Sequence, residues 1–94
     1  MAVGDAVVNL SSISNNAFLD IQPGSGVEWF VNHVFHEADV EIYWYDGSNN
    51  LKFVSATGAN FETIMARATN AIRPRVKNVS GTTKLMGFVG VITK

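Results

Sequence analysis

The chain has 94 residues, a formal net charge of −1 at pH 7 and no cysteine. This length allows one small domain, residues 1–94, and the missing cysteines exclude disulfide frameworks, thiolate nucleophiles and cysteine-based zinc sites. The near-neutral charge gives no electrostatic reason to expect nucleic acid or an anionic membrane as a partner. We expect no membrane-spanning segment and no signal peptide, because no apolar run approaches the necessary length of ~20 residues and residues 1–5 lack a basic region.

The composition favours an all-β fold. The residue types enriched in strands (Val, Ile, Thr, Phe, Tyr and Trp) occupy 34 of the 94 positions, whereas good helix formers such as Leu, Lys and Glu are scarce. Asn, Ser and Gly occupy another 24 positions, which is enough for many turns. No long segment carries the apolar stripe of a helix.

The first part of the chain predicts up to three strands. Residues 1–16 form either a first strand over 3–10 or an extended N-terminal arm, because a polar stretch follows at 11–16. Residues 17–21 predict a short strand that stops at a turn rich in proline and glycine. Residues 27–36 predict a long strand in which both alternating sets of side chains contain large apolar residues. Neither face of that strand is therefore simply solvated.

The second part predicts four or five more strands, at 40–46, 51–55, 61–68, 71–79 and 84–93. In the first of these, Trp44 faces inward with the other apolar residues, whereas Tyr43 and Tyr45 face outward beside Glu41. Residues 61–68 are compatible with a short helix or a strand, and we favour a strand because the flanking pattern is β. Pro74 marks its strand as an edge or a bulge, since proline cannot donate to a ladder. The sequence thus predicts an antiparallel sandwich or a jelly-roll-like fold of seven to eight short strands.

No arrangement of polar residues predicts catalysis or metal binding. His33 and His36 are the only histidines, and their odd spacing in a strand places them on opposite faces. The eight carboxylates show no pairing that suggests acid–base chemistry, and a domain of this size rarely forms a deep cleft. No serine lies in a nucleophile-elbow motif. We therefore expect no enzyme, no cofactor and no metal.

A basic row and a pair of tyrosines are candidates for an interaction surface. Arg73, Arg75 and Lys77 share one strand face, where they either contact an acidic protein surface or a phosphate, or protect an edge strand from aggregation. Tyr43 and Tyr45 either stack on sugars, are buried by a neighbouring subunit, or are ordinary surface residues.

The apolar content argues for association. A domain below about 100 residues is marginally stable, and small domains usually add disulfides, metal or oligomerisation. The first two are not expected here, yet 47% of the residues are hydrophobic. We expect the surplus apolar residues on outward positions to meet another chain. These positions are Phe30, Val34, Tyr43, Tyr45, Met86 and Phe88.

Three runs of residues resemble small virion proteins of tailed bacteriophages. They are FLDIQPGSGVEW at 18–29, YDGSN at 45–49 and RVKNVSGTTK at 75–84, and the resemblance covers about residues 17–94. Such proteins are generally small β-sandwich parts of the particle, as capsid decoration (cement) proteins or as parts of fibres and tails. The resemblance transfers no functional residue, because its motifs belong to turns and strands.

The resemblance and the apolar surplus together predict a viral structural protein. We expect a capsid decoration protein, made in the host cytoplasm and located on the capsid surface of the virion. It binds the major capsid protein and itself, with a trimer as the favoured homo-oligomer, and so stabilises the shell. The alternative is a carbohydrate- or receptor-binding module of a phage fibre or tail. The expected interaction residues are Tyr43, Tyr45, Phe30, Phe88, Arg73, Arg75 and Lys77.

Overall fold

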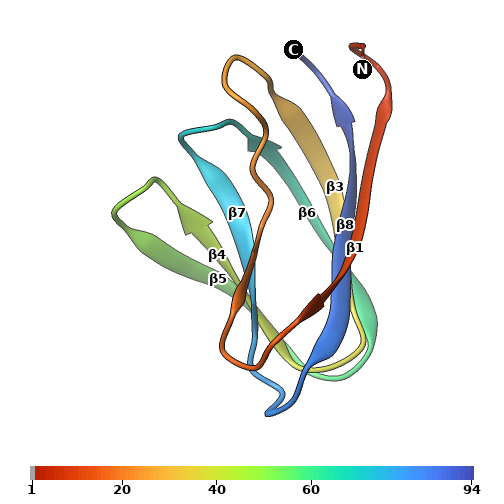
Figure 1. Cartoon of the computed structure of the whole chain (residues 1–94), viewed down its shortest axis with the longest axis vertical. Helices are drawn as coiled ribbons and strands as arrows, with labels where there is room; N and C mark the ends of the chain where they lie inside the picture. The colour runs from red at the N-terminus through yellow and green to blue at the C-terminus, as the bar shows by residue number, and fades with distance from the viewer. Residues whose placement is uncertain (1) are drawn as a thin grey trace.

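The computed structural model describes residues 2–94, which form two layers of β-strands (Figure 1). No helix occurs in this part of the chain. The strands are β1 (Ala6–Ile13), β2 (Phe18–Asp20), β3 (Trp29–His36), β4 (Val40–Tyr45), β5 (Asn50–Ala56), β6 (Asn60–Ala68), β7 (Arg73–Asn78) and β8 (Lys84–Ile92).

The strands pair as one long folded hairpin. β1 pairs with β8, β2 with β7, β3 with β6 and β4 with β5, all antiparallel. This hairpin then rolls up, which places β8 beside β3 and β7 beside β4. The result is a four-stranded sheet A with the order β1-β8-β3-β6 and a four-stranded sheet B with the order β2-β7-β4-β5. This strand order is that of a jelly roll. The predicted all-β antiparallel sandwich is confirmed.

The core lies between the two sheets and consists of aliphatic side chains with one phenylalanine. Apolar side chains on the inward face of each strand supply it, as expected for a sandwich with one buried face per sheet. The buried hydrophobic residues are Val7, Leu19, Ile21, Val31, Val34, Val40, Ile42, Ala68, Val76, Met86, Phe88 and Ile92.

A β-bulge at Asn32 changes the alternation of side chains along β3. The register against β8 shifts by one residue between Val31 and His33, so Asn32 is an extra residue in the strand. The inward-facing residues therefore belong to one alternating set before the bulge and to the other set after it: Trp29 and Val31, then Val34 and His36. This shift is one reason why both alternating sets of this segment contain large apolar residues.

Strand β8 also has apolar residues on both faces, and its orientation differs from the expectation. Met86 and Phe88 lie in the core with 0% and 4% of their surface exposed, and Val34 on β3 is fully buried. Leu85 and Val91 face outward instead. The outward placement of Met86 and Phe88 is therefore wrong, because alternation alone does not tell which face of a doubly apolar strand points inward. The outward placement of Val34 is also wrong, because the bulge at Asn32 moves the alternating set that contains Phe30 from the outward to the inward face beyond the bulge.

Two ambiguous segments are ordinary strands. β1 pairs with β8 over all eight of its residues, so the polar residues from Ser11 onward continue the strand instead of ending it. Apart from Met1, which lies outside the described residues, the first segment thus holds a regular strand and is not an extended arm. The strand expected at 61–68 is confirmed as β6, with a bulge at which Met65 adopts a φ of 50°.

Pro74 lies in the interior of sheet B on a strand without a register shift, so the expectation of an edge strand or a bulge is wrong. β7 has β2 on one side and β4 on the other. The Pro74 carbonyl accepts a hydrogen bond of 3.2 Å from the N–H of Ile21, just beyond the end of β2. A strand residue directs its N and its C=O to the same side of the strand. The nitrogen of Pro74, which carries no hydrogen, therefore also points toward Ile21 and away from β4. The proline therefore removes no bond of the β4–β7 ladder.

The buried side chain of Asn78 joins the turns at one end of the sandwich. Its Nδ2 donates to the carbonyls of Ile13 (2.7 Å) and Thr82 (2.8 Å), and its Oδ1 accepts from the N–H (2.9 Å) and the hydroxyl (2.7 Å) of Ser80. The main chain of Asn78 exchanges two further bonds with Asn16 and Ala17. All hydrogen-bonding groups of this fully buried amide are therefore used, as burial of a polar group requires.

We expect the side-chain NH₂ donor of Asn78 to contribute more to the stability of the fold than the volume of the side chain does. In Asn78→Asp an oxygen replaces Nδ2 opposite two carbonyl oxygens, so we expect a loss of about 3 kcal/mol or more in the free energy of unfolding, measured in urea. Asn15→Asp is the matched control, because the exposed Asn15 accepts from the N–H of Gly81 through an oxygen that aspartate keeps. Its effect should stay within about 0.5 kcal/mol. Equal losses in the two variants would contradict this account.

Candidate interaction surfaces

The outward face of sheet A is the most apolar surface of the protein. Ten large hydrophobic residues are exposed among residues 2–94, and six of them lie on this face. They come from three of its four strands, β1, β8 and β6: Val8, Leu10, Leu85, Val91, Phe61 and Met65. Phe30, Phe35 and Val89 fill the space between them and are half-buried. Apolar residues concentrated on one sheet face indicate a surface that another molecule covers.

Aromatic residues cluster at one end of this face, on β3 and β6. Phe35 and Phe61 pair across β3 and β6, with ring centroids 5.3 Å apart, and His33 lies 6.1 Å from Phe61. Gly87 pairs with Phe35 from the other side. A Cβ at Gly87 would come within 2.6 Å of the Phe35 ring and would also overlap the carbonyl oxygen of Asn9. The glycine thus allows the ring to lie flat on β8.

The same end of the face is hollowed. A depression of about 630 Å³ opens beside the phenylalanine pair, with a polar rim that includes Glu37 and Asn60. Its apolar lining comes from β1, β3, β6 and β8: Leu10, Phe35, Phe61 and Leu85. An apolar hollow with a polar rim is the form that receives an anchoring side chain in protein–protein contacts.

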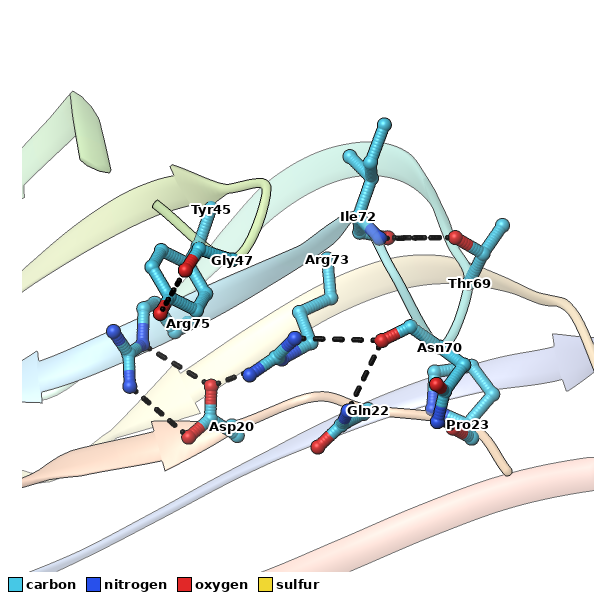
Figure 2. A network of polar contacts seen from close by, with 10 residues as sticks. All are labelled: Asp20, Gln22, Pro23, Tyr45, Gly47, Thr69, Asn70, Ile72, Arg73 and Arg75. Carbon is cyan, nitrogen blue, oxygen red and sulfur yellow. Dashed lines mark hydrogen bonds and ion pairs between the residues drawn. The ribbon is translucent and has the colours of Figure 1, made fainter. Parts of the chain in front are cut away.

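The outward face of sheet B is built differently, because its charges are paired within the chain. Figure 2 shows Asp20 on β2 between Arg73 and Arg75 of β7. The Asp20 carboxylate lies 3.2 Å from Nε of Arg73 and 3.1 Å from both Nε and Nη2 of Arg75. The Arg73 and Arg75 side chains are only 12% and 15% exposed. Two of the three cations in the expected basic row are therefore neutralised in part and largely covered.

Aromatic rings cover these guanidinium groups. The Arg75 guanidinium lies 4.2 Å from the ring centre of Tyr45 and 4.0 Å from that of Phe18, so it sits between the two rings. Arg73 lies 4.8 Å from the Tyr45 ring. The Tyr45 hydroxyl donates to the carbonyl of Gly47 at 2.9 Å. Cation–π contacts and hydrogen bonds thus use the groups that would otherwise be offered to a ligand.

Tyr43 is similarly engaged. Its hydroxyl donates to Oε1 of Glu41 at 2.6 Å, and Lys52 lies 3.4 Å from Oε2 of the same carboxylate. The hydrogen bond from Tyr43 lowers the pKa of Glu41, and Lys52 lowers it further. The same bond raises the pKa of Tyr43, because losing its proton would place two negative charges side by side.

The structure separates the expected interaction residues into three places. Tyr43, Tyr45, Arg73, Arg75 and Lys77 lie together on sheet B, whereas Phe30 lies on the outward face of sheet A and Phe88 lies in the core. Most of the apolar face of sheet A is absent from the residues expected to interact. The alternation of Val8 and Leu10 in β1 is a sequence signal for this face, but it does not distinguish a strand from an extended arm.

A second apolar surface opens between the sheets along their β5 and β6 edges. This groove has a volume of about 560 Å³. It is lined by Trp44, Leu51, Phe53, Ala66, Arg67, Thr69 and Ile72. The lining is almost wholly apolar, and Trp44 is here half-buried instead of enclosed in the core.

The two histidines lie on opposite faces, as expected. His33 faces outward on sheet A, whereas His36 is buried with its Nδ1 2.8 Å from the carbonyl of Ala38 and its Nε2 3.1 Å from Oε2 of Glu62. Within residues 2–94 no cluster of three or more histidine or carboxylate side chains could hold a metal ion. Nor does that part of the chain contain a helix long and apolar enough to cross a membrane.

Comparison with protein-family models found no match, and comparison with curated proteins found none either.

The pairing of Tyr43 with Glu41 can be tested by titration. In Tyr43→Phe the carboxylate loses its closest donor, so we expect the pKa of Glu41 to rise toward its ordinary value, followed by NMR of the side-chain carboxyl. Asp46 provides the internal control, since its pKa is lowered chiefly by the backbone N–H groups of Asn49 and Ser48 and should not change. An unchanged Glu41 would contradict the assigned bond.

Proposed function

We propose that this protein is a non-catalytic structural protein that acts by binding other protein surfaces, itself included. The observation that carries the proposal is the outward face of sheet A, where six exposed large hydrophobic residues cover three strands. On sheet B, by contrast, Arg73, Arg75 and Tyr43 already have charged partners within the chain. The apolar face is therefore the surface whose burial would contribute most to binding, at roughly 25 cal/mol per Å².

The size of the domain supports association as the role of this face. A chain of 94 residues without cysteine has one small core, and covering its largest apolar surface adds stability that the core does not supply. A homo-oligomer is the simplest way to cover it. A trimer stays a prediction for the stoichiometry.

We place this structural role in a bacteriophage particle, as a capsid decoration protein. Two observations support this choice: the resemblance of residues 17–94 to small virion proteins, and the jelly-roll strand order, which occurs in viral capsid domains. The same fold also occurs in lectins, so the fold alone does not decide the role. Binding to the assembled shell but not to free subunits would stabilise the shell by mass action.

The carbohydrate-binding alternative finds less support. It relied on outward tyrosines as stacking platforms for sugar rings, but the Tyr45 ring is covered by two guanidinium groups and both tyrosine hydroxyls already donate within the chain. We therefore retain the capsid role as the leading proposal and the fibre or tail module as its competitor.

Charges placed on the apolar face should weaken association. We expect the double variant Phe61→Lys, Leu85→Lys to raise the dissociation constant of self-association by 10- to 100-fold, which corresponds to about 1.4–2.7 kcal/mol. The double variant Leu51→Lys, Phe53→Lys is the control with the same added charge, because both residues are exposed and apolar but line the groove at β5 instead of the face of sheet A. Sedimentation velocity over a range of concentrations measures both. A monomeric wild type, or equal effects of the two double variants, would refute the assignment of the face.

The particle role needs a separate measurement. Quantitative mass spectrometry of purified virions from the virus that encodes the chain should find it in hundreds of copies for a decoration protein, and in tens for a fibre or tail component. Particles that lack the protein should lose heat resistance, and adding the purified protein back should restore it. Complete absence from the particles would refute the virion role and leave the association of the isolated protein untouched.

A further inference from the structure

Three of the four sheet edges carry features that prevent pairing with another strand. β2 has only three residues. β5 has a register shift beside Phe53 and carries Lys52, and β6 has a bulge at Met65 and carries Glu62 and Arg67. Short strands, bulges and charged residues are the usual devices by which edge strands avoid pairing.

Strand β1, the fourth edge, lacks all of these features. It is eight residues long, pairs with β8 without a register shift, and contains no proline, glycine or charged residue. Its side chains on the outward face of sheet A include Val8 and Leu10, which are 64% and 61% exposed. A long, regular, apolar edge of this kind is a template for another strand.

The ladder with β8 shows which backbone groups of β1 remain available. The N–H of Ile92 donates to the carbonyl of Asp5, so odd-numbered residues direct their backbone groups to β8. Since alternate residues of a strand direct these groups to opposite sides, the even-numbered residues of β1 direct theirs away from the sheet. Within residues 2–94 no strand lies on that side of β1. The available groups belong to Ala6, Val8, Leu10 and Ser12.

We propose that β1 pairs antiparallel with β1 of a second copy of this chain, around a two-fold axis at Asn9. For the available N–H and C=O groups of the two strands to meet, each even-numbered residue of one copy must lie opposite an even-numbered residue of the other. The register centred on Asn9 pairs Ala6 with Ser12 and Val8 with Leu10 in both directions, so all four available residues exchange bonds. Registers centred on Val8 or Leu10 leave one of the four without a partner.

This pairing names the partner surface and the geometry of the homo-oligomer in the proposed function. It rests on that proposed function, because it requires the chain to bind itself. Two copies of sheet A join into one eight-stranded sheet with both apolar faces on the same side. Val8 of each copy then lies beside Leu10 of the other on that face, which favours the pair further. The smallest unit is a dimer, in contrast to the trimer favoured from the sequence, and the doubled apolar face remains available for a further surface.

Amide hydrogen exchange tests the pairing on the unaltered protein. We expect the amides of Ala6, Val8, Leu10 and Ser12 to exchange at least tenfold more slowly at concentrations where sedimentation shows associated protein, and to lose this protection on dilution. The amides of Val7, Asn9 and Ser11, which face β8, should stay protected at both concentrations. Fast exchange of the four even-numbered amides in associated protein would overturn the proposal.

A single introduced cysteine tests the register, because the natural chain has none. Residue 9 faces its own copy across the axis at a Cα distance of about 4.5–5.5 Å, so Asn9→Cys should oxidise to a covalent dimer. Ser11→Cys is the control on the same strand face. Its two copies would lie about 14 Å apart along the strands and should stay reduced. Equal crosslinking of the two variants would contradict the Asn9 register.

The outcomes separate this proposal from the proposed function. If Phe61→Lys, Leu85→Lys abolishes association while the four edge amides of the wild type exchange fast, association occurs through the sheet face and the β1 pairing is wrong. If the edge amides are protected in the associated wild type, the pairing is supported whatever the effect of the face variant. A wild type that stays monomeric at every concentration overturns both.

Discussion

The buried amide of Asn78 is the polar contact that holds two turns together at one end of the sandwich. Its Nδ2 donates to the carbonyl of Ile13, which is 65 residues away in the sequence, and to that of Thr82, which is 4 residues away. Its Oδ1 accepts from the N–H of Ser80. The turn from β1 to β2 and the turn from β7 to β8 thus share one buried polar group, which links β7 of sheet B to the end of β1 in sheet A. An apolar residue at this position would leave carbonyl groups without donors in the interior.

Much of the fold could be predicted from local patterns. The turn at 46–49 is one example: Asp46 accepts the N–H groups of Ser48 and Asn49, and Gly47 adopts a φ of 98°. The alternation in 40–45 likewise gave the correct outward face for Tyr43 and Tyr45. The bulge at Asn32 could not be predicted, because it appears only in the register with neighbouring strands. The orientation of β8 depends on the same register.

The candidate site was harder to predict than the fold for a related reason. The basic row on β7 was located correctly on one face, but its ion pairs join Arg73 and Arg75 to Asp20, which is more than 50 residues away in the sequence. Because these two arginines are paired within the chain, they are less available to bind a partner than the sequence alone suggests. Asp20, Gly47 and Asn78 show the same behaviour, since each serves a turn or a contact within the chain.

The nested pairing of the strands also has a kinetic consequence. β4 and β5 are the only strands adjacent in sequence that pair with each other in the described chain, and every other pair joins residues separated by longer segments. Long-range pairs cost more loop-closure entropy, so topologies rich in them fold in milliseconds to seconds. The central hairpin is the natural place for folding to begin, and the ladder between β1 and β8 encloses the longest loop. The strand that enters the sandwich last would then be the same strand whose outer edge is open, so this edge is presented to a neighbour only once the fold has closed.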